Sequence, residues 1–346
     1  MQHLLTRSLA VSAAALSIAS LTPTAFAHTV RSASAGHAAA ATQYPGFVVN
    51  VFANGTSKLF NPDGIVVTKD AVFVDYQNAS DTQSVPSTIV KYGRDGHLLG
   101  SVEILGRCDG LRLNPYTHKL WALVNNDGLN GSPPRQPALF VIDPGTLAAQ
   151  RYAFATAKQP HGGGYDDMAF LHGRAFFSAS SPTLNGKIND KPIVVEATLQ
   201  TSVVTIRPIL YGNAGGANVT DPDSMAVVGD QLVVVSEGDS QIVFVNQPGN
   251  GGQTSRVVPT GTNLDDVAEA TGTSGTMYVA DSALNRVYAI RATVPAGSVF
   301  AEAPASSGVR SFIGSLNLST GTLTPYLTVR DGIVDPTALI FVRSGN

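Results

Sequence analysis

The feature that most constrains the fold of this chain is an aspartate that recurs at the start of short apolar segments. The segments read "DGIVV", "DGLRL", "DDMAF", "DSMAV", "DDVAE" and "DPTAL", and they begin at Asp63, Asp109, Asp166, Asp223, Asp265 and Asp335. The starts are spaced by roughly 40 to 70 residues, and short strands that recur at such a period are typical of a β-propeller, in which each repeat is one blade.

A second and often a third apolar segment follow each aspartate after a short polar turn. Examples are "AVFVDY" (71–76) and "QLVVVSE" (231–237). Val, Ile, Phe and Tyr between Gly, Asn, Asp and Pro turns favour β-strands. We assign "TMYVAD" (276–281) to the blade that starts at Asp265, and we interpret "GSVFAEAPASSG" (297–308) as a candidate loop insertion.

Six starts predict an all-β fold, a six-bladed β-propeller that forms a single domain over residues 44–346. The last start leaves too little chain for a whole blade, so we expect "YPGFVVNVF" (44–52) to supply the missing strand and close the ring with the C-terminal strand. Closure removes sheet edges that would invite aggregation. Five or seven blades stay open, as does a β-sandwich, although a sandwich does not explain the fixed place of the aspartate.

Residues 1–27 are predicted to be a secretory signal peptide. Arg7 marks a positive region, residues 9–21 are apolar and small, and Ala25-Phe26-Ala27 forms a small-x-small cleavage site. We therefore expect cleavage after Ala27, a secreted or periplasmic location and no membrane span. Residues 28–43 are a low-complexity leader that we expect to be disordered.

Composition excludes some partners. The chain is only 14% charged with a net charge of -3, so nothing indicates a nucleic-acid partner. Cys108 is the one cysteine, which leaves no internal disulfide in an exported protein. We expect a monomer, and no motif implies an organic cofactor.

The propeller geometry gathers the recurring acids at one mouth of the central channel, because the first strand of each blade lines that channel. Oxygen ligands from several blades suit a hard cation, and Ca²⁺ is the best match. The metal candidates are Asp109, Asp167, Asp223, Asp265 and Asp266. Each aspartate could equally cap a turn by accepting backbone amide hydrogen bonds, but a turn needs only one acid where this chain twice has two.

His161 and Asp166 are the catalytic candidates. His161 precedes three glycines on the same face of the predicted propeller, and an imidazole titrates near neutral pH, as a general base should. A surface-loop histidine is the alternative interpretation. Asp166 opens the doubled acid pair in "HGGGYDDMAF".

The stretch "SGTMYVADSALNRVYAI" (274–290) resembles the senescence-marker-protein, gluconolactonase and paraoxonase superfamily of six-bladed propellers with NHL-like repeats. The resemblance implies hydrolysis of lactones or organophosphates with a divalent metal, usually calcium, at the channel mouth. It matches Asp223 and Asp265 to ligand positions at inner-strand starts, Asp266 to a second ligand and Asp281 to a nearby polar position. The early Glu-Gly-Pro of that superfamily is absent, and "NPDG" (61–64) stands in its region.

Two functions follow as hypotheses. The first is an exported lactonase-type hydrolase that acts on a lactone-like small molecule with a divalent cation. The second is a non-catalytic propeller that binds a ligand or a protein partner on the same face.

Overall fold

A computed structural model describes residues 46–78, 85–125, 137–156, 163–180, 187–305 and 309–345. They belong to one compact unit, Ala41–Asn346. The predicted signal peptide and leader lie outside the described residues. Within the described ranges there is no α-helix, only the 3-10 turns η3 (Ala214–Gly216) and η4 (Val329–Asp331), and no helix long and apolar enough to cross a membrane.

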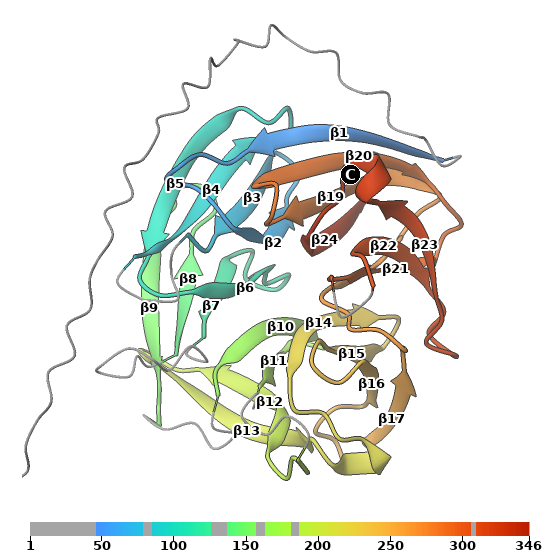
Figure 1. The fold of residues 1–346 in the computed structure, drawn as a ribbon. Helices are drawn as coiled ribbons and strands as arrows, with labels where there is room; N and C mark the ends of the chain where they lie inside the picture. Colours follow the sequence, from blue (N-terminus) through green and yellow to red (C-terminus); the bar gives the residue numbers. More distant parts are fainter. Residues whose placement is uncertain are drawn as a thin grey trace, which may run out of the picture. The chain divides into compact units, whose positions relative to one another are not determined.

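The described residues are otherwise organised as short strands (Figure 1). The strands are β1 (Phe47–Asn54), β2 (Pro62–Val67), β3 (Ala71–Tyr76), β4 (Ser87–Gly93), β5 (Leu98–Ile104), β6 (Cys108–Leu113), β7 (Leu120–Val124), β8 (Ala138–Ile142), β9 (Ala149–Phe154), β10 (Tyr165–Leu171), β11 (Arg174–Ala179), β12 (Pro192–Leu199), β13 (Val203–Tyr211), β14 (Pro222–Val228), β15 (Gln231–Ser236), β16 (Gln241–Asn246), β17 (Thr254–Pro259), β18 (Val267–Glu269), β19 (Ser274–Asp281), β20 (Arg286–Thr293), β21 (Val299–Ala303), β22 (Phe312–Leu316), β23 (Leu323–Thr328) and β24 (Pro336–Arg343).

These strands form four four-stranded sheets and one eight-stranded sheet. The four-stranded sheets have the orders β2-β3-β4-β5, β14-β15-β16-β17, β18-β21-β22-β23 and β24-β19-β20-β1. The eight-stranded sheet joins β6–β9 to β10–β13 through a parallel contact of β13 with β9. That contact consists of only two residue pairs, Val203 with Ala153 and Val204 with Phe154.

The innermost strands surround a central channel. Strand β2 contacts β6, and the contacts continue through β10, β14, β18 and β24 back to β2. Figure 1 shows the sheets arranged around this axis in chain order. The all-β propeller arrangement predicted from the repeat is therefore confirmed.

The two ends of the described chain close the ring, as the sequence predicts. In the closing sheet the C-terminal strand β24 lies innermost and the N-terminal strand β1 lies outermost, on β20. The register of β1 runs from Phe47 opposite Ala292 to Asn54 opposite Arg286.

One blade assignment is wrong. Strands β19 and β20 do not follow β18 into its sheet, because β19 pairs with β24, and β18 pairs with β21. Length is consistent with this pairing: β18 has three residues, whereas β24 has eight and pairs with β19 from Gly275 to Asp281. The segment interpreted as a loop insertion contains β21, and residues 312–316 and 323–328 form two further strands of the same sheet.

The hydrophobic core lies between adjacent sheets. Buried side chains of β2–β5 pack with those of β6–β8, and the same holds around the ring. The ring of Phe47 from β1, for example, meets Phe300 edge-on at a centroid distance of 6.0 Å and so joins two sheets. Trp121, the single tryptophan, is 6% exposed and belongs to this core.

Candidate functional site

Four of the six recurring aspartates lie in backbone bulges at the start of inner strands. The register of β2 on β3 shifts between Pro62 and Ile65, around Asp63. Equivalent shifts surround Asp109 in β6, Asp166 in β10 and Asp223 in β14. A bulge turns a side chain away from the regular alternation of a strand. This explains why the acid recurs near the start of these four inner strands.

The sixth repeat is offset from its expected place. In β24, Pro336 pairs with Asp281 and Ala338 with Ala280, so the residue inside the shift is Thr337. Asp335 precedes the strand, where its carboxylate accepts a hydrogen bond of 2.6 Å from Ser282 Oγ. Asp335 still lines the pocket at the mouth, but it lies before the closing strand and not in a bulge, which is a correction to the repeat predicted from sequence.

The inner strands approach closely at these bulges, and glycine makes room for them. A Cβ placed on Gly110 would lie 2.5 Å from the carbonyl oxygen of Asp166 and 2.9 Å from Cα of Asp167, on the neighbouring strand. A side chain at this position would therefore clash with the backbone of β10. This contact explains why a glycine follows the aspartate of the repeat in β6.

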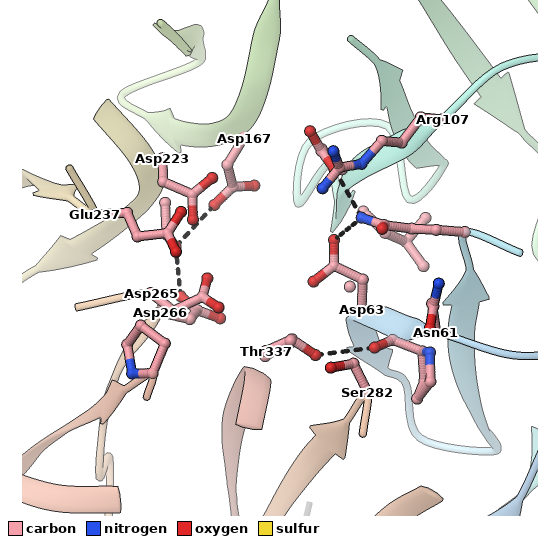
Figure 2. A pocket seen from close by; sticks show the side chains of 18 of the residues that line it. Asn61, Asp63, Arg107, Asp167, Asp223, Glu237, Asp265, Asp266, Ser282 and Thr337 are labelled. Atoms are coloured by element: carbon pink, nitrogen blue, oxygen red, sulfur yellow. Dashed lines mark hydrogen bonds and ion pairs between the residues drawn. The ribbon is translucent and has the colours of Figure 1, made fainter. Parts of the chain in front are cut away.

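A pocket of about 370 Å³ opens at the mouth (Figure 2). Its described lining is strongly acidic and includes two arginines. The charged lining residues are Asp63, Asp109, Asp167, Asp223, Glu237, Asp265, Asp266 and Asp335, with Arg107 and Arg112. Such a pocket repels anions and favours cations or hydrogen-bond donors.

In one half of the pocket, the acids have hydrogen-bond and ion-pair partners within the protein. Gln77 Nε2 donates to Asp63 Oδ2 at 2.6 Å and to Asp109 Oδ1 at 2.7 Å. Arg107 Nε lies 3.0 Å from Asp109 Oδ1 as an ion pair. Burial first, and then the charges of Asp75 and Asp109, raise the pKa of Asp63 well above its ordinary value.

The other half holds acids to which no arginine of the described residues is bonded. Asp223 on β14 and Asp265, just before β18, are hydrogen-bonded to each other through their side chains. Burial raises the pKa of both well above the ordinary value, and the charge of Glu237 adds to the effect on both. The contact between the two raises the pKa of Asp265 further, whereas their hydrogen bond lowers that of Asp223. Burial also raises the pKa of Glu237, against the opposing charge of Arg107. Two acids this close keep a proton between them unless a cation takes its place.

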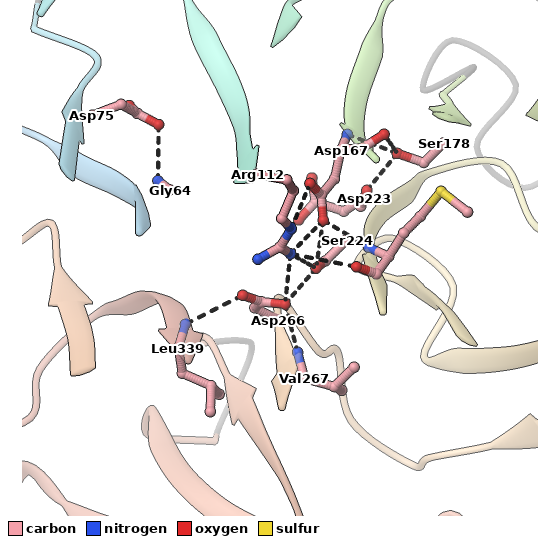
Figure 3. Close-up of polar contacts among 11 residues, drawn as sticks. Gly64, Asp75, Arg112, Asp167, Ser178, Asp223, Ser224, Asp266, Val267 and Leu339 are labelled. Carbon is pink, nitrogen blue, oxygen red and sulfur yellow. Dashed lines mark hydrogen bonds and ion pairs between the residues drawn. The ribbon is translucent and has the colours of Figure 1, made fainter. Parts of the chain in front are cut away.

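Below the mouth, Arg112 crosses the channel and binds two more of the predicted ligands (Figure 3). Its Nε donates to Asp167 Oδ1 at 3.0 Å, and its Nη2 lies 3.3 Å from Asp266 Oδ1. Burial alone would lower the pKa of Arg112, but the charges of Asp167 and Asp266 raise it above the ordinary value. These two acids already have a protein cation as their partner.

The same network ties inner strands together. Met225 N donates to Asp167 Oδ2 at 2.9 Å, and Leu339 N donates to Asp266 Oδ2 at 3.2 Å. Ser224 Oγ bridges the two carboxylates, at 3.2 Å from Asp167 and 2.6 Å from Asp266. Side chains and amides of five inner strands or their flanks therefore meet at one arginine.

Sequence reasoning missed Arg112. It is the fourth residue of "DGLRL", a charged side chain inside an otherwise apolar strand of a chain with few charges. That exception was the available signal, because a charge is rarely buried without a partner.

Two further acids lie buried on second strands. Asp75 Oδ2 accepts from Gly64 N at 2.9 Å. Glu302 on β21 is fully buried, and neither of its carboxylate oxygens has a hydrogen-bond partner among the described residues. Burial raises the pKa of both well above the ordinary values.

The structure describes only one of the two catalytic candidates. His161 lies outside the described residues. Asp166 is 4% exposed, is absent from the described pocket lining and accepts a hydrogen bond of 3.0 Å from Asn125 Nδ2. Asp109, Asp167, Asp223, Asp265 and Asp266 do line the pocket.

The donor chemistry of the acid half fits a hard cation. Asp223, Glu237 and Asp265 offer only carboxylate oxygens, which Ca²⁺ prefers. Within the described part of the chain no three His, Cys, Asp or Glu side chains are already gathered as a metal-binding group. Binding of a cation would therefore need loss of the shared proton and a local shift of these side chains.

Comparisons with known proteins were made with both sequence and structure. No family model and no curated protein sequence matches the chain. Solved structures similar to it include a putative 6-phosphogluconolactonase from Bacteroides uniformis, with 11% identity, 82% of this chain and 89% of that chain covered, and a TM-score of 0.49. Virginiamycin B lyase from Staphylococcus aureus has 10% identity, 71% and 99% coverage and a TM-score of 0.40. A glucose dehydrogenase has 13% identity, 83% and 90% coverage and a TM-score of 0.47. We infer no activity from likeness at this level.

Proposed function

We propose that this protein is an exported six-bladed β-propeller hydrolase of the lactonase type, with a divalent cation bound at the channel mouth. The count of six divides the eight-stranded sheet at its two-pair contact between β9 and β13. Each half then has four strands, like the other sheets. Export is tested separately, by N-terminal sequencing of the mature protein for a first residue at His28.

The proposal rests on one observation, the acid half of the pocket, where Asp223 and Asp265 have no arginine bonded to them among the described residues. Asp223 and Asp265 share a hydrogen bond beside Glu237, whereas the other pocket acids described above have Arg107, Arg112, Gln77 or Ser282 as partners. Asp223, Glu237 and Asp265 would hold the cation, with Ca²⁺ the best match to their oxygens. When bound, such an ion polarises a carbonyl oxygen or acidifies a water molecule.

The remaining pocket residues supply orientation and proton transfer. Arg107 is 38% exposed at the mouth and would orient a polar group of the substrate from the side opposite the cation. Burial raises the pKa of Asp63, which favours its protonated form, and Gln77 Nε2 donates a hydrogen bond to its Oδ2. We propose Asp63 as the group that protonates the leaving oxygen when a lactone ring opens.

The alternative is a propeller that binds a cationic ligand at the same mouth without catalysis. The acid half favours it as well, since its ligands are not pre-assembled and an organic ammonium group would satisfy the same acids. The two functions differ in whether a lactone is turned over.

Calorimetric titration of the mature protein with Ca²⁺ tests the proposal. We expect one site in the wild type, and at least about tenfold weaker binding in Asp223→Asn/Asp265→Asn, equivalent to about 1.4 kcal/mol. Asp230→Asn is the matched control, because that carboxyl is 79% exposed and pairs with His172 outside the pocket.

Activity is then measured with γ- and δ-lactones, with and without a chelator. Calcium-dependent ring opening, lost in the double variant and kept in the control, supports the hydrolase. Calcium binding without turnover of any lactone supports the non-catalytic alternative. If the wild-type protein binds no calcium, the proposed cation site at the mouth is refuted.

A further inference from the structure

The end of the channel opposite the acidic mouth is mainly apolar, although Glu269 also lines it. The inner strands run from the mouth to a second hollow of about 340 Å³, which the ends of all six strands line. Its apolar lining includes Val67, Leu113, Phe170, Val227, Ala268 and Ile340. Arg112 lines both this hollow and the mouth, so its ion-pair network separates an acidic end from an apolar end.

A larger pocket of about 860 Å³ continues from this hollow. The two share Val67, Leu113, Thr271, Ile340 and Phe341. The larger pocket reaches across the seam between the sheet of β2–β5 and strands β6–β9, over Phe73 and the Pro144–Gly145 turn. Its size lies within the range of ligand pockets, which are commonly about 300 to 1,000 Å³ and mostly apolar.

The described rim of the larger pocket carries more positive than negative side chains. Lys69, Lys91 and Arg343 line it together with the acid Asp70. Lys91 Nζ donates to Pro144 O at 2.8 Å and lies 5.8 Å from the centroid of the Phe73 ring. This charge is opposite in sign to that of the mouth.

We propose that this pocket binds an amphipathic monocarboxylate, a molecule with one carboxylate head and an unbranched apolar tail. The head would lie at the rim with Lys69 and Arg343, where it stays hydrated and is attracted by both charges. The tail would cover Leu113 and Ile340 toward the channel and remove apolar surface from water. Neither cation chemistry nor any residue of the acidic mouth takes part.

Binding of three ligands with the same tail and different heads tests the charge and the tail separately. The ligands are dodecanoate, dodecanol and dodecyltrimethylammonium, each titrated calorimetrically into the mature protein below the concentration at which it aggregates. We expect dodecanoate to bind with one site and at least about tenfold more tightly than the other two. Added salt should weaken dodecanoate binding and leave dodecanol binding unchanged.

Variants then locate the site. Lys69→Glu/Arg343→Glu should weaken dodecanoate binding at least about tenfold without affecting dodecanol, whereas Lys187→Glu, an exposed lysine outside the pocket, should change neither. Ile340→Ser should weaken both ligands.

Equal binding of the three heads, or full dodecanoate binding by the charge-reversed variant, overturns the proposal. Binding to vesicles of anionic lipid without binding of monomeric dodecanoate also overturns it, in favour of a membrane surface. A chelator should not change dodecanoate binding, so this result is independent of the calcium test at the mouth.

Discussion

Replacing Arg112 with methionine should destabilise the propeller strongly. The change keeps most of the side-chain length but removes the charge that serves Asp167 and Asp266, which are only 7% and 5% exposed as side chains. Removing one partner of a buried ion pair typically costs about 3–5 kcal/mol, because the other charge stays buried and unpaired.

The hydrogen bonds that remain place the expected value near the lower end of that range. Asp167 would keep Met225 N and Ser224 Oγ as donors, and Asp266 would keep Leu339 N and Val267 N. We therefore expect a loss of about 3 kcal/mol in the free energy of unfolding. Arg112→Lys should lose less, since it keeps the charge but not the two-pronged contact with Asp167.

Urea unfolding followed by the fluorescence of Trp121, the single and buried tryptophan, measures this loss. The triple variant Arg112→Met/Asp167→Asn/Asp266→Asn should recover part of it, because it removes the unpaired charges as well. Arg291→Met, at an exposed position on β20, is the control and should stay within about 0.5 kcal/mol of wild type. A loss below about 1 kcal/mol for Arg112→Met would refute the view that this network holds the inner strands together.

Three further predictions concern single side chains. Glu302→Gln should stabilise the protein at alkaline pH in denaturant titrations. The raised folded-state pKa of Glu302 gives stability that is complete below the pKa of the unfolded state and is lost as pH rises through the pKa of the folded state. Equal pH dependence in variant and wild type would contradict this. Gly110→Ala should lower the free energy of unfolding by about 1–3 kcal/mol through the clash with Asp166 O. An unchanged unfolding midpoint would show that the β10 backbone can shift without loss of stability. Glu196→Gln should remove stability only above the folded pKa of Glu196, which its hydrogen bond to Arg174 lowers; wild type should lose the same stability as pH falls through that pKa, so the two unfolding curves should meet in acid.

Much of the fold could be predicted from local sequence. The repeated aspartate with its apolar strand gave the propeller arrangement, and the pattern at residues 44–52 predicted the closing contact of β1 with the C-terminal sheet. Both depend on alternation and turn residues, which act within a few positions along the chain. The partition of strands into sheets at the closing end was not predictable in this way, because β19 is equally suited by composition to β18 or β24. Strand length is consistent with the observed pairing of β19 with β24.

The sequence alone determined that acids gather at the channel mouth, since a recurring residue in a recurring strand must recur in space. Only the tertiary structure decided the partner of each acid. Arg112 reaches Asp167 and Asp266 across the channel, from positions 55 and 154 residues away in the chain. Asp223 and Asp265 lie beside each other with raised pKa values, and no arginine of the part of the chain that the structure describes is bonded to them. Ion pairing and desolvation depend on distance and burial in three dimensions, and neither is written in the spacing of the repeat.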